Sequence, residues 1–315
     1  MKLPISLIIL TRDEEVNIGK CLESVKDWVF EIFVVDSFST DSTAQIAKGY
    51  GANVVVHPFE NQAKQFNWAL DNLKINNEWI LRLDADEEMT KELWQEIAEK
   101  LDKMNYEIQN QYENTKVRNA NDKINGFYMK RRVYFMGRWI KHGGYYPTWI
   151  LRLFRNGRGR SEDREMDEHI VLTRGRAEKL ENDFIDRNLK GLGFWINKHN
   201  TFATREANVV MKTLEHESMK TSGHENIKAL KQDIEGPPAL RREAKERYYR
   251  LPPFLRVFIY FFNRYFLRMG FLDGKEGFIF HILQGFWYRF LVDAKLYEAK
   301  KQKSTRAREH ESKWL

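Results

Sequence analysis

The chain has 315 residues, of which 42% are hydrophobic and 14% aromatic. This is enough apolar material for a core, which excludes a wholly disordered protein. Its formal net charge is +7, and its single cysteine, Cys21, excludes an internal disulfide framework and a cysteine-based zinc or iron–sulfur site. The absence of about 18 to 20 consecutive apolar residues argues against a membrane-spanning helix. We therefore expect a cytoplasmic protein with one long domain, or one domain and an appendage.

The first hundred residues alternate between strand and helix patterns. Strands are predicted over 5–10, 32–35, 54–56 and 79–83, and helices over 16–28, 39–48 and 62–73. Apolar runs separated by helices of this length are typical of βαβ units, so we predict an α/β fold with a parallel sheet. Ligands of such sheets bind beyond the carboxyl ends of the strands.

The remainder is predicted less regularly. We expect a polar surface excursion over 105–123, strands over 126–134, 150–154 and 169–173, and a long helix over 189–216. Two Pro-Pro pairs, at 237–238 and 252–253, bracket a charged connector. Residues 254–297 are rich in Phe, Tyr and Trp, and residues 239–315 hold 17 Lys and Arg against 8 Asp and Glu.

Acidic residues at the ends of two predicted strands are the clearest chemical signals. Asp84-Ala85-Asp86 follows the strand over 79–83, and two carboxylates there can hold a hard divalent cation through oxygen. Asp36 begins a run rich in hydroxyl groups, Asp36 to Thr43, which suits polar ligands. For each of the two, the alternative is ordinary helix capping with solvated charge.

Four motifs in this order resemble glycosyltransferase family 2 of the GT-A fold. They are Thr11-Arg12-Asp13-Glu14-Glu15-Val16-Asn17-Ile18, Asp36-Ser37-Phe38-Ser39-Thr40-Asp41, the helix Gln62 to Leu70 with Asn67-Trp68-Ala69-Leu70, and Leu83-Asp84-Ala85-Asp86-Glu87. The resemblance is strong over about residues 3–90. Asp13 stands where the family usually has Asn.

The resemblance implies a site for a nucleotide-sugar donor. It would be lined by Thr11, Asp13, Glu14, Asp36, Ser37, Lys64, Asn67 and Asp84, with Arg152 able to reach the diphosphate. Asp86, with Asp84 beside it, would ligate Mg²⁺ or Mn²⁺. A structural ion pair is the alternative for Arg152.

A second acidic cluster extends from Glu162 to His169. An inverting glycosyl transfer needs a base that takes the proton from the acceptor hydroxyl. The cluster resembles the segment where the family places this base, and we rank Glu168 and Asp167 above Asp163. A solvated acidic loop is the alternative.

The carboxyl-terminal region has the pattern of helices lying in a membrane interface. Arg256, Tyr260, Arg264 and Arg268 recur every four residues in an aromatic segment, and Trp287, Tyr288 and Arg289 are candidate anchors. Basic residues at 300–308 would attract anionic lipid. Alternatively, these helices pack on the catalytic domain or on a second copy of the chain.

These observations predict a metal-dependent, inverting glycosyltransferase. Residues 1–235 would form the GT-A catalytic domain, with a nucleotide-sugar half (1–100) and an acceptor half (125–235), and residues 236–315 a region for membrane association. The donor would be UDP-linked by preference, and the acceptor lipid-linked or of lipopolysaccharide type, in surface-polysaccharide synthesis. The protein would lie on the cytoplasmic face of the membrane through residues 254–308.

Two alternatives have different chemistry. A sugar-nucleotide nucleotidyltransferase usually needs a glycine-rich, basic loop after its first strand, whereas Thr11 to Glu15 is acidic. A non-enzymatic membrane-binding or nucleic-acid-binding protein would use the basic aromatic tail, but the aromatics lie in helical, Phe-rich runs rather than among Lys and Arg on strands. We therefore expect no nucleic-acid partner.

Overall fold

The computed structural model describes residues 2–113, 123–164, 166–220 and 237–312. By packing, the chain divides into two units, which are described separately. Residues 1–141 and 145–190 form the first, here called the sheet unit. Residues 142–144 and 191–315 form the second, here called the helical unit. The division falls after Lys190, whereas the predicted boundary at 235/236 lies outside the described residues and stays a prediction.

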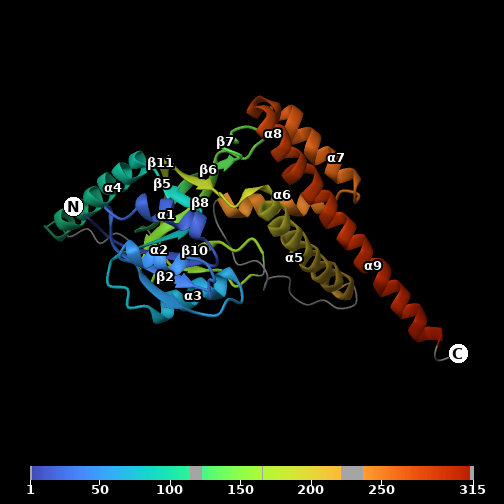
Figure 1. Cartoon of the computed structure of the whole chain (residues 1–315), viewed down its shortest axis with the longest axis horizontal. Coiled ribbons are helices and arrows are strands. Elements are labelled where there is room, and N and C mark those ends of the chain that lie inside the picture. Colours follow the sequence, from blue (N-terminus) through green and yellow to red (C-terminus); the bar gives the residue numbers. More distant parts are fainter. Residues whose placement is uncertain (1, 114–122, 165, 221–236, 313–315) are drawn as a thin grey trace. The chain divides into compact units, whose positions relative to one another are not determined.

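The sheet unit is built on one mixed sheet (Figure 1). Its strands are β1 (Leu3–Thr11), β2 (Val29–Asp36), β3 (Asn53–Val56), β4 (Trp79–Asp84), β5 (Glu87–Met89), β6 (Ile124–Phe135), β7 (Arg138–Trp139), β8 (Thr148–Arg155) and β11 (Arg176–Arg187). They are ordered β3-β2-β1-β4-β8-β6-β11-β5, and β7 pairs with β6. Strands β3, β2, β1 and β4 are parallel, as predicted, and β8 then runs antiparallel to β4.

Helices α1 (Glu15–Glu23), α2 (Thr43–Gly49), α3 (Gln62–Asn72) and α4 (Lys91–Glu113), with a two-stranded sheet of β9 (Gly159–Ser161) and β10 (Ile170–Leu172), complete this unit. Apolar clusters on both faces of the sheet bury β1, whose side chains Ile5, Leu7 and Ile9 contribute to one cluster and Ile8 to the other. A strand covered on both faces needs apolar residues at successive positions, which explains the continuous run seen in the sequence.

Three expectations for this unit differ from the structure. Helix α1 ends at Glu23 rather than at residue 28, and Ser24 donates its hydroxyl to the Cys21 carbonyl there. Residues 105–113 of the expected surface excursion continue helix α4, and 114–122 lie outside the described residues. Strand β11 was missed because it is highly charged; Asp183 and Asp186 form ion pairs with Arg132 and Arg131 of β6.

The helical unit contains α5 (Gly191–Lys220), α6 (Pro237–Tyr249), α7 (Leu255–Phe262), a π-helical segment (Asn263–Leu267), a 3₁₀ turn (Gly270–Asp273), α8 (Gly274–Phe280), a second π-helical segment (His281–Trp287) and α9 (Tyr288–Ser312). Ala203 and Ala207 of α5 pack against Tyr288, Val292 and Leu296 of α9. The charged connector of the sequence analysis is helix α6. None of the described helices has both the length and the apolar character that a transmembrane span requires.

Two arginines that the sequence analysis assigned to a membrane interface, Arg256 and Arg289, form ion pairs inside the helical unit, whereas Arg268 is exposed. Arg256 is 4% exposed and forms a bidentate ion pair with Asp293, which is 1% exposed. Arg289, expected as an interfacial anchor, forms an ion pair with Glu206, as Lys245 does. Although burial acts to raise the pKa of Glu206, these cations and two tyrosine hydroxyls lower it to about 2.

We predict that Asp293→Asn lowers the free energy of unfolding by about 3–5 kcal/mol, because it leaves the buried Arg256 charge without its counter-charge. The matched control is Glu243→Gln, which breaks the exposed ion pair with Arg247 and costs less than about 1 kcal/mol. Urea unfolding followed by far-ultraviolet circular dichroism measures both. Similar losses in the two variants would contradict the role assigned to the buried pair.

Candidate active site

Polar residues from three neighbouring strands meet at one edge of the sheet. Thr11 of β1 lies level with Asp36 of β2, and Leu10 lies level with Asp84 of β4. The strands are parallel, so their carboxyl ends reach the same edge. The Thr11 hydroxyl donates to Asp36 Oδ1 at 3.0 Å, which ties the first two strand ends together.

The Asp36 carboxylate is held in a network of hydrogen bonds. Asp36 is 3% exposed and also accepts from the Ser39 amide at 2.9 Å and from the Ser39 hydroxyl. The hydroxyl of its neighbour Ser37 accepts from the side-chain nitrogen of Gln65, Nε2, at 3.0 Å. The network fixes the loop after β2 in place, so Asp36 and Ser37 form a rigid polar wall at the sheet edge.

The backbone and contacts at position 13 suit both Asp13 and the Asn that the family usually has there. Its φ of 52° lies in the left-handed region, which Asn and Asp adopt more easily than most residues. The Asp13 carboxylate accepts from the Thr40 amide at 2.7 Å, and the Asp13 amide donates to the Ser39 hydroxyl at 2.8 Å. Either residue type meets the backbone requirement and supplies an acceptor for the loop after β2.

Asp84 lies between two arginines of the sheet. Arg152 Nη2 donates to Asp84 Oδ2 at 3.0 Å, and Arg82 Nη2 lies 3.8 Å from Asp84 Oδ1. Arg152 is 5% exposed and also pairs with the buried Glu87. Burial raises the pKa of Glu87, and the Arg152 charge opposes this rise. The structural ion pair considered for Arg152 is therefore present, and it is formed with acids of the site.

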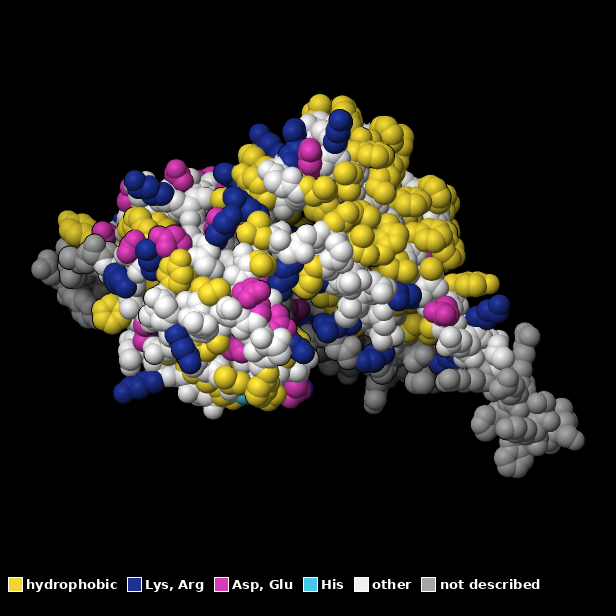
Figure 2. Space-filling view, in the orientation of Figure 1, with side chains coloured by type: hydrophobic (Ala, Val, Ile, Leu, Met, Phe, Trp, Pro, Cys, Tyr) yellow, Lys and Arg dark blue, Asp and Glu magenta, His cyan; other side chains and the backbone are white. Residues whose placement is uncertain are grey.

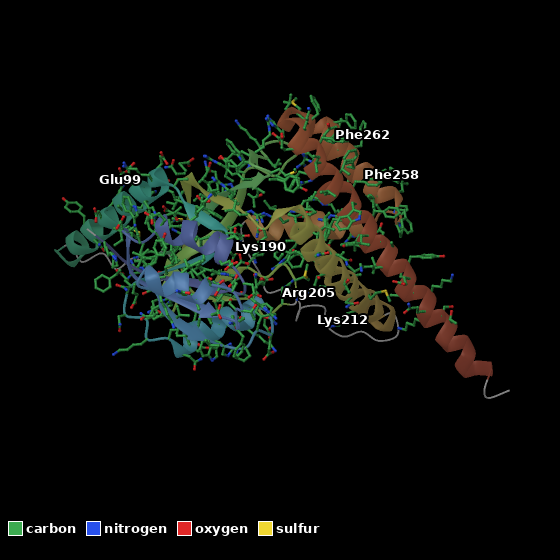
Figure 3. The ribbon with its side chains drawn as sticks, viewed as in Figure 1. Glu99, Lys190, Arg205, Lys212, Phe258 and Phe262 are labelled. Carbon is green, nitrogen blue, oxygen red and sulfur yellow. The ribbon has the colours of Figure 1, made fainter. Side chains whose placement is uncertain are left out.

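Asp86 faces residues that the sequence analysis did not single out. Its Oδ2 accepts from the Asn188 amide at 2.8 Å. Nearby, Lys190 donates to Glu14 at 2.6 Å. Burial raises the pKa of Glu14, and the charge of Asp86 adds to this rise, whereas Lys190 opposes it. Asn188 and Lys190 come about 100 residues after Asp86 in the chain, directly after β11 (Figure 3). No local pattern identifies them; only pairing of the missed strand β11 with β5 brings them here.

The structure separates the acids of the 162–169 cluster. Glu168 is half-buried and interacts electrostatically with Arg82 and Asp84. Burial raises the pKa of Glu168, and Arg82 opposes this rise. Asp167 and Asp163 are exposed. Glu162 is buried and accepts from the His169 amide, which places it in the β9–β10 framework. Glu168 is therefore the acid of this cluster that lies beside the end of β4.

Two predicted donor-site residues make their described contacts elsewhere. Lys64 is exposed and forms an ion pair with Glu60, which lies just before α3. The Asn67 amide group donates to the Ser161 carbonyl at 2.8 Å and accepts from the Ser161 amide at 2.9 Å, which fastens β9 to α3. Their part in donor binding stays a prediction.

The carboxylate oxygens at the end of β4 are suitable ligands for a hard divalent cation. Asp84 and Asp86 offer carboxylate oxygens at a partly exposed strand end, and such cations usually take one or two carboxylates and fill the remaining positions with water and phosphate. Asp84 already faces two arginines, which makes Asp86 the better ligand of the pair. Within the described ranges, no group of three His, Cys, Asp or Glu side chains forms a closed metal site.

A family model identifies this arrangement. The model for glycosyl transferase family 2 matches residues 6–156, the segment that runs from β1 through β8. This segment, slightly less than half of the chain, is of the glycosyl transferase family 2 type. Its mixed sheet with helices on both faces has the GT-A fold, which confirms the resemblance and the fold class predicted from the sequence.

Relatives of known sequence agree with this assignment. The lipopolysaccharide core biosynthesis glycosyltransferase LpsC of Rhizobium meliloti is 27% identical over 94% of this chain and 93% of its own length. An uncharacterized glycosyltransferase of Rickettsia felis is 46% identical over 93 residues, which are 30% of this chain and 32% of that protein. The chain thus matches about a third of the length of the Rickettsia relatives.

Solved structures give only partial superpositions. Staphylococcus aureus TarS in complex with UDP matches with a TM-score of 0.26 and 26% identity over 40% of each chain. Glucosyl-3-phosphoglycerate synthase of Mycobacterium tuberculosis with Mn²⁺ and UDP matches with a TM-score of 0.24 and 25% identity over 26% of this chain and 33% of that one. Both superpositions cover less than half of each chain.

Proposed function

We propose that the protein is an inverting glycosyltransferase that moves a sugar from a nucleoside-diphosphate donor, UDP-linked by preference, to a lipid-linked or lipopolysaccharide-type acceptor. The observation that carries this proposal is the meeting of Asp36, Asp84, Asp86 and Glu168 at one sheet edge within a family 2 fold. The similarity to LpsC supports the choice of acceptor class.

Each residue has a part suited to its surroundings. The rigid wall of Thr11, Asp36 and Ser37 would bind the nucleoside, whose N–H and hydroxyl groups need fixed acceptors. Asp86 and Asp84 would hold Mg²⁺ or Mn²⁺, which supplies positive charge beside the leaving diphosphate. Arg82, Arg152 and Lys190 would add cationic side chains at the same edge.

Glu168 would act as the general base. In the proposed step, its carboxylate takes the proton of an acceptor hydroxyl while that oxygen bonds to the anomeric carbon and the bond from this carbon to the diphosphate oxygen breaks. A carboxylate whose pKa is raised by burial is a stronger base than an exposed one. Asp167 stays the second candidate, since it adjoins Glu168, and Asp163 the third.

The family match favours glycosyl transfer over the two alternatives of the sequence analysis. A nucleotidyltransferase would need a basic phosphate-binding loop after β1, and that position holds Asp13 and Glu14, whose side chains bond to Thr40 and Lys190. Nucleic-acid binding has no support at the acidic sheet edge.

Donor binding tests the proposal directly. We expect calorimetric titration of UDP into the full-length chain with Mn²⁺ to show binding that weakens at least about tenfold in Asp86→Ala, because the variant removes a carboxylate ligand of the metal. Titrations of GDP and dTDP show which nucleobase the donor site prefers. The matched control is Glu92→Ala, an exposed acid on α4, which should bind UDP as the unaltered chain does. Metal-independent binding, or none, would contradict the proposed donor site.

The second prediction concerns Glu168 as the general base. We expect Glu168→Gln to reduce kcat at least about 10²-fold while the UDP affinity stays unchanged, because general-base catalysis contributes about 10²–10⁴-fold. Asp167→Asn serves as the comparison and should have a smaller effect. Since the base acts in its ionised form and its pKa is raised above 4.5, kcat/KM should fall on acidification in a limb above pH 4.5 that Glu168→Gln removes. Near-normal turnover in both variants would rule out this assignment.

We further propose that the helical unit binds an anionic membrane surface. Besides its apolar interior, this unit holds two ion pairs inside and carries many large apolar residues on its surface. The exposed residues include Phe258, Phe262, Phe266, Leu267, Met269, Phe271, Leu272 and Phe278, each at least 45% exposed. Figure 2 shows apolar side chains gathered over the region of α7 and α8.

The chemistry of this surface favours lipid as its occupant. A patch of this kind on a water-exposed face marks an interaction site. Exposed Arg268 and Lys275 lie in the same segment as the apolar residues, and Lys300, Lys301 and Lys303 are exposed on α9. Cations beside a broad apolar surface match anionic headgroups above acyl chains. The predicted side chains at 306 and 308 lie outside the described residues.

Vesicle binding tests this part. We expect the double variant Phe258→Ser/Phe262→Ser, whose two side chains project from α7 (Figure 3), to reduce partition onto phosphatidylglycerol-containing vesicles about tenfold or more. The matched control is Phe30→Ser/Phe59→Ser, which removes two exposed phenylalanines of the sheet unit. Co-sedimentation measures both. Equal partition of the variant and the control would contradict a lipid-binding role, and vesicle-independent self-association would point to a second copy of the chain as the occupant.

A further inference from the structure

A cluster of cationic and aromatic side chains lies on the sheet unit beside the proposed active site and has no part in the function argued so far. It is called here the basic cluster, and it comprises Lys130 and Arg132 of β6, Trp139 of β7, Lys141, Tyr146, Trp149 of β8, Lys179 and Asp183 of β11.

The register of the sheet places this cluster at the edge that carries the carboxylates. Trp149 lies level with Lys130, and Lys130 lies level with Asp183. Leu81 of β4 pairs with Leu153 of β8, and the strands are antiparallel, so Asp84 falls near Ile150, the neighbour of Trp149. Beyond the end of β4, the sheet therefore continues into the basic cluster.

The cluster also lies on the face of the sheet where Glu168 is found. Side chains two residues apart on a strand share a face. Trp149 is two residues from Leu151, and Lys130 two from Tyr128, and both of these neighbours belong to the apolar cluster of Ile8 and Phe66. Arg82 lies over the Phe66 ring and therefore on this same face, and its charge interacts with that of Glu168.

The cations are arranged around aromatic rings and one buried acid. Lys130 and Lys179 lie 5.6 Å and 5.1 Å from the ring centre of Trp149. Arg132 and Lys141 lie 4.5 Å and 5.3 Å from that of Trp139.

Asp183, which is 6% exposed, holds the cluster together. Its carboxylate accepts from Arg132 at 2.7 Å and from the Tyr146 hydroxyl at 2.9 Å, and Lys130 lies 3.7 Å from it. These contacts fix Lys130, Arg132 and Tyr146 before any ligand arrives.

The positive charge of the cluster exceeds what this acid neutralises. Lys141 and Lys179 are exposed, and neither forms an ion pair with a carboxylate in the described part of the chain. The indole nitrogen of Trp139 is buried without a hydrogen-bond partner among the described residues. Cations gathered against their mutual repulsion favour an anionic ligand, and aromatic faces suit the faces of a sugar ring.

We propose that the basic cluster is the acceptor subsite and that it recognises a saccharide bearing phosphate groups. The proposal rests on the proposed function and deepens it by naming the acceptor's chemical class. Lys141 over Trp139 and Lys179 over Trp149 would bind anionic groups of the acceptor, on the face of the sheet that also carries Glu168. The donor's diphosphate is bound elsewhere, at Asp84 and Asp86, so the two anionic ligands occupy different ends of the same edge.

The test compares a phosphorylated probe with its dephosphorylated counterpart. Deacylated, phosphorylated lipopolysaccharide core oligosaccharide, and the same oligosaccharide after enzymatic dephosphorylation, are titrated into the full-length chain. We expect the phosphorylated probe to bind at least about tenfold more tightly, and Lys141→Gln/Lys179→Gln to abolish that advantage. Both lysines are exposed and lack ion pairs, so the variant keeps the fold. The matched control is Lys91→Gln/Lys103→Gln on α4, which makes the same change of charge away from the cluster and should retain the preference.

A UDP titration on the same samples separates the two proposals. The Lys141→Gln/Lys179→Gln variant should bind UDP with unchanged affinity, and loss of UDP binding there would overturn the assignment of the cluster to the acceptor. Equal affinity for the two oligosaccharides, or equal losses in the variant and the control, would overturn it as well. So would tighter binding of a single-stranded oligonucleotide than of either saccharide. Absence of UDP binding in the unaltered chain would count against the proposed function and leave the oligosaccharide comparison intact.

Discussion

The parallel register of β1, β2 and β4 is the constraint on which the site depends. Because these strands run side by side in one direction, Thr11, Asp36 and Asp84 reach one edge even though they lie far apart in the chain. Strand β8 runs antiparallel to β4, whereas β6 and β11 are parallel to each other and antiparallel to β8. Together they extend the sheet and bring Arg152, Asn188 and Lys190 to the site. A shift of one residue between strands would turn these side chains to the opposite face.

The edge is organised by charge. Acids cluster at the end of β4, and each has a defined partner: Asp84 with Arg152, Asp86 with Asn188, Glu14 with Lys190. Buried like charges would otherwise take up protons, as the raised pKa values of Glu14 and Glu168 indicate. Lys190 opposes the rise in the pKa of Glu14, and Arg82 opposes that of Glu168. Farther along the edge the sign reverses, where Lys130 and Arg132 surround Asp183.

The helical unit follows a different rule. Its ion pairs, Arg256 with Asp293 and Arg289 with Glu206, lie in the interior, while phenylalanines of α7 cover its surface. The four-residue spacing of Arg256, Tyr260, Arg264 and Arg268 showed correctly that one helix face is polar. It did not show that Arg256 is buried while Arg268 is exposed, because an amphipathic pattern has the same period whichever face meets water.

The sequence by itself determined the early βαβ order, the family and the acids at the strand ends, because continuous apolar runs and short motifs are local in the chain. It missed β11, whose charged residues lack an apolar pattern and are neutralised only by Arg131 and Arg132 of another strand. It also left Glu168 and Asp167 equivalent. Only the tertiary structure decided that Glu168 lies beside Arg82 and Asp84, that Lys190 pairs with Glu14, and which helix face is buried. These depend on contacts between residues distant in sequence, which no local pattern encodes.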